Sequence, residues 1–166
     1  MYKLSVLNIS GDVLSCLESL LNNRMQHVRI GNSVSSLRSV KSGVQQGSIL
    51  GPQCFILFIN DLQHYLPSHA VCKLFADDFK SYMMINKKSV NIDFNLIIAS
   101  VQCWADAWQL PLSVDKCSWM MMSNKLIKAK HYFTISNTKL CESSVIKDLG
   151  VTFDSKLNFS VQMSWV

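Results

Sequence analysis

The chain has 166 residues, of which 49% are hydrophobic and 16% are charged, and its formal net charge at pH 7 is +5. This length suits one domain with a sizeable core, and no run of about 18 consecutive apolar residues predicts a helix that spans a membrane. The charge mildly favours a polyanionic partner, and six scattered cysteines without a signal peptide predict free thiols in a reducing, intracellular compartment.

The chain begins with a predicted helix and a predicted hairpin. Asp12 to Asn22 carries apolar side chains at helical spacing, which predicts a helix. After it, Gln26 to Ile30 and a segment from Ser33 onward predict two strands around the tight turn Gly31-Asn32. Asp12 itself is expected to lie just before the first helix.

A glycine-rich segment from Gly43 to Gly51 follows, and a second helix is predicted directly after it. Pro52 is placed to open this helix, because the fixed φ of proline suits the first helical turn. The helix is expected to end near Pro67. Its apolar residues repeat at helical spacing: Phe55, Ile59, Leu62 and Leu66.

The second half alternates between strands and helices. Val71 to Ala76 and Phe79 to Ile85 predict a β-hairpin, and a long helix is predicted from about Ser89 to Gln109. One side of that helix carries Ile92, Leu96, Ala99, Cys103 and Ala107. Three further strands are expected, at Ser118 to Met122, Tyr132 to Ile135 and Val145 to Phe153. This order predicts an α+β fold with helices packed on one face of an antiparallel sheet.

Two adjacent carboxylates, Asp77 and Asp78, stand at the tip of the predicted central hairpin. Like charges side by side repel each other unless a cation lies nearby. Hard oxygen ligands of this kind hold Mg²⁺ against substrate phosphates. The pair is therefore a candidate metal site, although Asp-Asp in a turn also occurs as a solvated loop.

The segment from Lys41 to Pro52 is a candidate anion-binding loop. Glycine allows a ligand to approach the backbone closely, and the N-terminus of a helix offers unpaired N–H groups. No Gly-Lys-Ser or Gly-Lys-Thr closes the segment, so it is not a Walker loop. Taken alone, it is equally compatible with a flexible loop before a helix.

Three motifs in order are far more specific than either feature alone. Gly43 to Pro52, Phe58 to Leu62 and Phe75 to Asp78 together strongly resemble the palm of non-LTR retrotransposon reverse transcriptases, the jockey-like mobile elements of animals. Segments similar to that family continue downstream and begin upstream. They are Trp104 to Leu110, Leu112 to Cys117, Asp148 to Leu157 and Asn23 to Ile30. The resemblance spans most of residues 11 to 160.

The resemblance implies a role for several residues. Asp77 is the principal ligand of a catalytic Mg²⁺, with Mn²⁺ also possible, and Asp78 lies beside it. Gln46 and Gly47 line the site where the incoming nucleotide meets the template base. The usual proline before them is Gln45 here, which frees the φ angle at that position.

Two more carried-over positions lie downstream. Lys116 matches a lysine near the leaving pyrophosphate, and it also fits an ordinary surface lysine. Leu149 and Gly150 belong to a turn that supports the 3′ end of the primer, and they also fit a strand with a bulge.

The resemblance makes the chain a single partial reverse transcriptase domain over residues 1–166. Residues 1 to about 110 form the palm with the glycine loop and the Ala-Asp-Asp hairpin. About 111–166 form the end of the palm, leading toward a missing thumb. Its partners are an RNA template, a DNA primer and deoxynucleoside triphosphates, with no membrane. Oligomeric state, template preference and the choice between nucleus and cytoplasm stay open.

Two-metal chemistry needs more than two adjacent carboxylates, and the family uses a third aspartate in an upstream Ala-Phe-Asp strand. Nothing in this chain matches that strand, so residues 1–166 alone are predicted not to extend a primer. The alternatives are an inactive remnant with at most residual nucleic-acid binding, and a metal-dependent nuclease using Asp61, Asp77 and Asp78. A zinc site at His64, His69 and Cys72 lacks a nearby fourth ligand.

Overall fold

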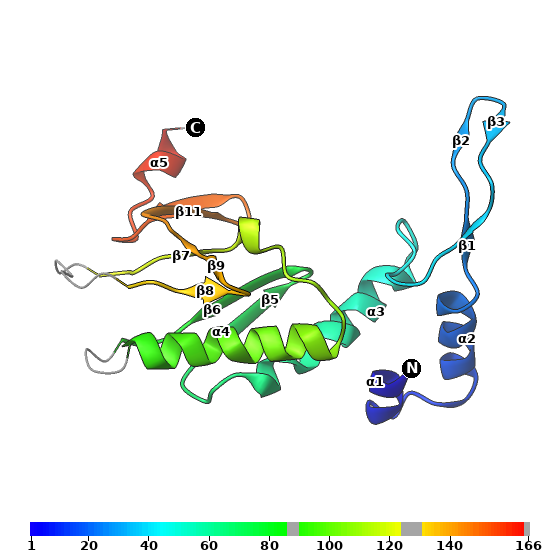
Figure 1. The fold of residues 1–166 in the computed structure, drawn as a ribbon, viewed down its shortest axis with the longest axis horizontal. Helices are drawn as coiled ribbons and strands as arrows, with labels where there is room; N and C mark the ends of the chain where they lie inside the picture. Colours follow the sequence, from blue (N-terminus) through cyan, green and yellow to red (C-terminus); the bar gives the residue numbers. More distant parts are fainter. Residues whose placement is uncertain (86–89, 124–130, 165–166) are drawn as a thin grey trace. The chain divides into compact units, whose positions relative to one another are not determined.

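The structure of the chain is a computed structural model, and it describes residues 1–85, 90–123 and 131–164. The chain divides into two compact units (Figure 1). Met1–Gln63 and Lys73–Lys80 make up the first unit, and His64–Cys72 and Ser81–Val166 make up the second. The central hairpin is therefore where the chain passes between the units.

Helices of the first unit agree well with the prediction. Helix α2 spans Gly11–Leu21, and α3 spans Leu50–Ile59 and continues as the 3-10 helix η1, Asn60–Tyr65. Asp12 was expected to lie before the first helix, and this was wrong. It lies in the first turn of α2, where the positive end of the helix dipole stabilises a carboxylate.

A five-residue helix α1, Tyr2–Val6, precedes α2 and was not predicted. It is too short to show a periodic apolar pattern. Its Leu4 is buried together with Leu17 of α2 and Cys54 of α3. Each of these three helices therefore contributes one buried side chain to this core cluster of the first unit.

The predicted hairpin after α2 is confirmed, in two paired parts. Strands β1 (Met25–Gln26) and β4 (Arg38–Ser39) pair antiparallel at its base. Strands β2 (Arg29–Ile30) and β3 (Ser33–Val34) pair antiparallel at its tip. Gly31 has a φ of 58° in the two-residue loop, a left-handed conformation that glycine adopts without a steric penalty.

The second unit is built on helix α4, Val90–Ala107, which confirms the predicted long helix. Strand β8 (Thr134–Ile135) packs against α4 and pairs antiparallel with β9 (Thr138–Lys139). Strand β7 (Ser118–Trp119) pairs in parallel with β10 (Cys141–Glu142). That parallel pair departs from the expectation of an antiparallel sheet.

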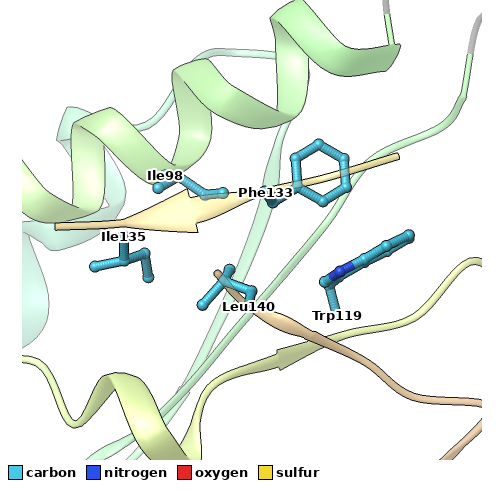
Figure 2. Close-up of a cluster of buried hydrophobic side chains, with 5 residues drawn as sticks. All are labelled: Ile98, Trp119, Phe133, Ile135 and Leu140. Atoms are coloured by element: carbon cyan, nitrogen blue, oxygen red, sulfur yellow. The ribbon is translucent and has the colours of Figure 1, made fainter. Parts of the chain in front are cut away.

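The core of the second unit lies between α4 and these short strands (Figure 2). Phe133, 1% exposed, packs edge-on against Trp119, with ring centroids 4.8 Å apart and planes at 90°. Aromatic pairs favour this geometry because the positive edge of one ring meets the negative face of the other. The buried members of the cluster are Ile98, Trp119, Phe133, Ile135 and Leu140.

The apolar side of α4 that stands out in the sequence is not the buried side. Ile92 is 73% exposed and Leu96 is 50% exposed. The buried positions of the helix are Val90, Ile97, Ile98, Val101, Trp104 and Ala105. Helix α4 is apolar on both sides, so periodicity identifies a helix there without identifying its inner face.

The predicted strand from Val145 to Phe153 is two strands. Strand β11 (Val145–Asp148) pairs antiparallel with β12 (Val151–Asp154), joined by the loop Leu149-Gly150. The four-residue helix α5, Ser160–Met163, follows. The described residues thus form a mixed helix and strand fold with small two-stranded sheets, compatible with part of a polymerase domain. The packing of a palm stays a prediction.

Within the described residues, no helix is both long enough and apolar enough to cross a membrane. All six cysteines are free thiols in the structure.

Candidate functional site

The central hairpin is confirmed, but its loop lies one residue earlier than predicted: Asp77 lies in the loop and Asp78 is the first residue of the second strand. Strand β5 covers Val71–Phe75 and pairs with β6, which covers Asp78–Tyr82, so Ala76 and Asp77 form a two-residue loop. Ala76 has a φ of 50°. An alanine in this left-handed region costs about 1–2 kcal/mol, a cost seen often where a backbone is held for function.

Both carboxylates are exposed, and neither side chain has a hydrogen bond or ion pair with residues 1–85, 90–123 or 131–164. Their oxygens are therefore open to a ligand from solvent. Two adjacent carboxylates suit one hard cation that also binds water or phosphate oxygens.

No three His, Cys, Asp or Glu side chains gather into a possible metal cluster among the described residues. The nuclease hypothesis, which needs Asp61 together with the tip carboxylates, is thus wrong for this arrangement. The zinc hypothesis at His64, His69 and Cys72 fails for the same reason.

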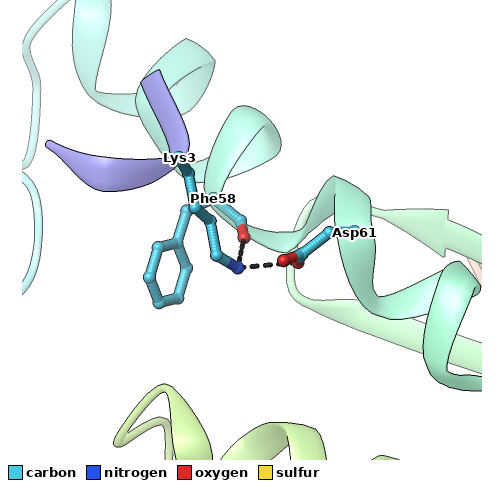
Figure 3. A network of polar contacts seen from close by, with 3 residues as sticks. All are labelled: Lys3, Phe58 and Asp61. Atoms are coloured by element: carbon cyan, nitrogen blue, oxygen red, sulfur yellow. Dashed lines mark hydrogen bonds and ion pairs between the residues drawn. The ribbon is translucent and has the colours of Figure 1, made fainter. Parts of the chain in front are cut away.

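Asp61 has another partner (Figure 3). Lys3 Nζ lies 2.6 Å from Asp61 Oδ1, donates to the carbonyl oxygen of Phe58, and stands 4.4 Å above the Phe58 ring. The Lys3 side chain is 12% exposed. These contacts tie α1 to the end of α3 and the start of η1, so Asp61 stabilises the first unit.

The glycine loop is closed by a small hydrogen-bonded ring before α3. Ser48 Oγ donates to the carbonyl oxygen of Gln45 at 2.8 Å and accepts from the backbone N–H of Gly51 at 2.9 Å. The second bond caps a free N–H of the first helical turn. Gln46 and Gly47 stand exposed on the bend of this ring, and Gly47 has a φ of 80°.

Arg24 holds the other end of the loop. Its Nε donates to the carbonyl oxygen of Leu21 at 3.1 Å, at the end of α2, and an Nη group donates to the carbonyl oxygen of Gly43. A cation is favourable at the carbonyl end of a helix. Arg24 therefore links α2 to the start of the glycine loop.

Lys116 belongs to the second unit. It is the last residue of the 3-10 turn η2, Val114–Lys116, and it is exposed. Its ammonium group has no hydrogen bond or ion pair within the described parts of the chain. Next to it, burial raises the pKa of the Cys117 thiol, so this cysteine is a poor nucleophile.

Leu149 and Gly150 form the tip of the β11–β12 hairpin. Their φ angles are 48° and 87°, and Asp148 pairs directly with Val151. Two consecutive left-handed residues make a type I′ turn, whose twist matches that of the strands. The alternative of a strand with a bulge is therefore wrong. The Leu149 side chain is 53% exposed at this tip.

Asp154 organises the chain after that hairpin. Its Oδ1 accepts from the backbone N–H groups of Asn158 at 2.8 Å and Lys156 at 2.9 Å. These donors, that of Asn158 above all, hold the pKa of the carboxyl below its usual range.

The expected site residues thus fall into two sets. The glycine loop and the tip carboxylates belong to the first unit, and Lys116 and the Leu149-Gly150 turn belong to the second. Sequence reasoning missed Lys3, Arg24 and Ser48. The available signal for Arg24 was its position as a cation shortly after a helix. The available signal for Ser48 was its position three residues before a helical glycine.

Comparison with known proteins agrees with this set of motifs. The model of the family described as "Reverse transcriptase (RNA-dependent DNA polymerase)" matches residues 3–153. The chain is 26% identical over 153 residues to the RNA-directed DNA polymerase from mobile element jockey of Drosophila melanogaster, covering 87% of this chain and 16% of that protein.

Two further relatives give the same picture. The jockey polymerase of Drosophila funebris is 25% identical over 161 residues, covering 91% of this chain and 17% of the relative. A probable RNA-directed DNA polymerase from transposon BS of Drosophila melanogaster is 29% identical over 153 residues, covering 86% and 17%. The chain spans about a sixth of the length of these relatives. No solved structure matches it.

Proposed function

This chain belongs to the reverse transcriptase (RNA-dependent DNA polymerase) family, and from that membership we propose that it carries the metal-binding and nucleotide-binding part of an RNA-directed DNA polymerase of a mobile element. The proposed substrates are deoxynucleoside triphosphates, an RNA template and a DNA primer. The observation that carries the proposal is the pair Asp77 and Asp78, exposed and without partners in the described residues, beside the strained Ala76.

Asp77 and Asp78 are the proposed ligands of a divalent metal, with Mg²⁺ first and Mn²⁺ as a substitute. Mg²⁺ binds through one or two carboxylates together with substrate phosphates, which suits two adjacent side chains on an open tip. When bound, the ion supplies positive charge against the phosphate oxygens of the nucleotide. The hairpin holds both carboxylates at a fixed spacing, because one lies in its loop and the other begins β6.

The remaining roles are assigned by chemistry. Gln46 and Gly47 are proposed to contact the incoming nucleotide and template base, since the bend exposes an amide side chain and bare backbone. Lys116 is proposed to donate to the leaving pyrophosphate, for which an exposed ammonium is suited. Leu149 and Gly150 are proposed to support the primer end, where an exposed leucine can contact the sugar.

The comparisons favour this polymerase function over a decayed remnant, because the family model covers residues 3–153 without leaving out any of these motifs. A remnant would also have no reason to keep both carboxylates unpaired at a strained loop.

Metal and nucleotide binding by the 166-residue chain tests the proposal. Free Mn²⁺ is measured by electron paramagnetic resonance, with and without deoxynucleoside triphosphate. We expect Mn²⁺ to bind more tightly with the nucleotide present, and we expect Asp77→Asn to weaken that binding at least tenfold, about 1.4 kcal/mol. Lys116→Gln should weaken the nucleotide complex and leave binding of Mn²⁺ alone unchanged.

Asp106→Asn is the matched control, since Asp106 is an exposed aspartate on α4. An equal loss in this control, or nucleotide-supported Mn²⁺ binding that ignores Asp77, would refute the proposed site. We expect no primer extension by the chain alone, because the described residues bring no third carboxylate to the pair. Templated incorporation that Asp77→Asn abolishes would contradict this expectation.

A further inference from the structure

Positive charge is concentrated in one segment of the chain. From Ser19 to Asn60 there is no Asp or Glu, and the basic residues are Arg24, Arg29, Arg38 and Lys41. The whole chain has 16 basic and 11 acidic residues, which leaves 12 basic and 11 acidic residues outside the segment. Nearly all of the net charge of +5 therefore lies on the β1–β4 hairpin and the glycine loop.

The hairpin is also unusually exposed. Every residue from Met25 to Ser39 is exposed, and in Figure 1 the paired strands extend away from the helices of the first unit. Its large apolar side chains are 56% to 77% exposed: Met25, Val28, Ile30, Val34 and Leu37. A two-stranded ribbon without a covered face is marginally stable in water, so a partner surface is expected.

Three of its cations are available to a partner. The side chains of Arg38 and Lys41 are exposed and have no hydrogen bond or ion pair within residues 1–85, 90–123 and 131–164. Arg29 donates from Nε to the carbonyl oxygen of Gly31 at 3.1 Å, which orients the guanidinium at the hairpin tip. Arg24 is occupied by the contacts at the start of the glycine loop.

We propose that the β1–β4 hairpin, with Arg29, Arg38 and Lys41, is an arm that binds the phosphate backbone of a nucleic-acid duplex. This inference rests on the proposed function, which supplies the nucleic acid. Arg38 pairs with Gln26, which lies three residues before Arg29, so the backbones of Arg29 and Arg38 lie about 10 Å apart along the ribbon. A two-stranded ribbon is narrow enough to enter a wide groove of a duplex, where its cations can reach the phosphates.

A phosphate backbone explains these features better than a protein partner does. Residues 19–60 contain no acidic residue, so this segment lacks the alternating charges that give protein interfaces their specificity. The apolar side chains between the cations suit contacts with sugars, and they need no pocket.

The test is binding of a fluorescein-labelled RNA–DNA hybrid duplex to the full chain, measured by anisotropy between 50 and 300 mM KCl without metal or nucleotide. Each phosphate contact contributes about 0.9 to the slope of log K against log salt. We expect Arg38→Gln and Lys41→Gln each to reduce that slope by about 0.9. The triple variant with Arg29→Gln should reduce it by about 2.7.

Lys147→Gln is the matched control, because Lys147 is an exposed lysine on β11, outside the hairpin. A loss equal to that of the hairpin variants would overturn the proposal, since binding would then follow total charge. Equal competition by polyglutamate of the same charge would also overturn it, in favour of a general polyanion site.

If the unmodified chain does not bind the duplex at 50 mM KCl, the proposed nucleic-acid-binding role of the hairpin is refuted. The Mn²⁺-binding test of the proposed function is not affected by that outcome. Conversely, hairpin-dependent duplex binding without nucleotide-supported Mn²⁺ binding would support the arm and refute the proposed function.

Discussion

Replacing Gly51 by alanine is expected to destabilise the glycine loop, even though alanine is the better helix former. Gly51 is the second residue of α3 and is buried. A methyl group there would lie 2.7 Å from Ser48 Oγ and 2.8 Å from the carbonyl oxygen of Gln45. Neither distance is tolerable for a carbon atom, and the second contact involves the backbone, so the loop must move.

The change in local stability is the sum of one favourable effect and two unfavourable effects. Alanine in a helix is favoured over glycine by about 1 kcal/mol. Overpacking costs about 1–3 kcal/mol, and displacing Ser48 weakens two hydrogen bonds of about 1 kcal/mol each. The collision outweighs helix propensity, and we expect a net local loss of about 2 kcal/mol.

Amide hydrogen exchange of peptides from the loop and α3 measures this loss directly. A loss of about 2 kcal/mol corresponds to a rise of roughly thirtyfold in the opening equilibrium. The tryptophans among the described residues are Trp104, Trp108 and Trp119, and all three lie in the second unit, so unchanged tryptophan fluorescence shows that this unit stays folded.

Protection in Gly51→Ala equal to or above that of the unmodified chain would refute the reasoning. Gly47→Ala is the control, because nothing lies within 4 Å of a methyl group there and only the cost of its φ of 80° applies. Adding Ser48→Ala to Gly51→Ala should destabilise less than the sum of the two changes, since it removes one colliding atom.

Arg24→Met should speed hydrogen exchange around Gly43 several-fold, because a side chain of similar length cannot donate to the loop; unchanged exchange would refute the link. Phe133→Ala should lower the stability of the second unit by about 3–5 kcal/mol in urea unfolding followed by tryptophan fluorescence, and a loss below about 1 kcal/mol would contradict its place in the core. Asp154 has a folded pKa below its unfolded value, so its ionised form stabilises the fold above the unfolded pKa, and this contribution is lost as pH falls through the folded pKa. Thermal melts should therefore show an advantage over Asp154→Asn at neutral pH that disappears in acid; a difference independent of pH would rule this out.

Local sequence signals predicted the helices and hairpins well wherever they depend on neighbouring residues. The Gly31-Asn32 turn, the Asp77-Asp78 hairpin and the long helix before Gln109 are examples, because turn residues and 3.6-residue periodicity act over a few positions. The strand expected from Val145 to Phe153 failed, since Leu149 gave no sign of the left-handed φ that it adopts beside Gly150.

The burial of α4 lay beyond any local signal. Its apolar residues surround the helix, so the stripe through Ile92 and Leu96 looked as suitable for a core as the side that packs against β8. The choice depends on Phe133 and Leu140, which lie about 40 residues away along the chain.

The sequence by itself determined the family of this chain and the identity of its candidate site residues, because the motifs from Gly43 to Asp154 are local and ordered. The tertiary structure decided which polar groups are free. The side chains of Asp77 and Asp78 stay exposed to solvent next to Ala76, whose φ is 50°. Asp61 forms an ion pair with Lys3, and Arg24 donates to the carbonyl oxygen of Gly43 in the glycine loop. Such pairings join residues up to 58 positions apart, and they arise only when helices pack.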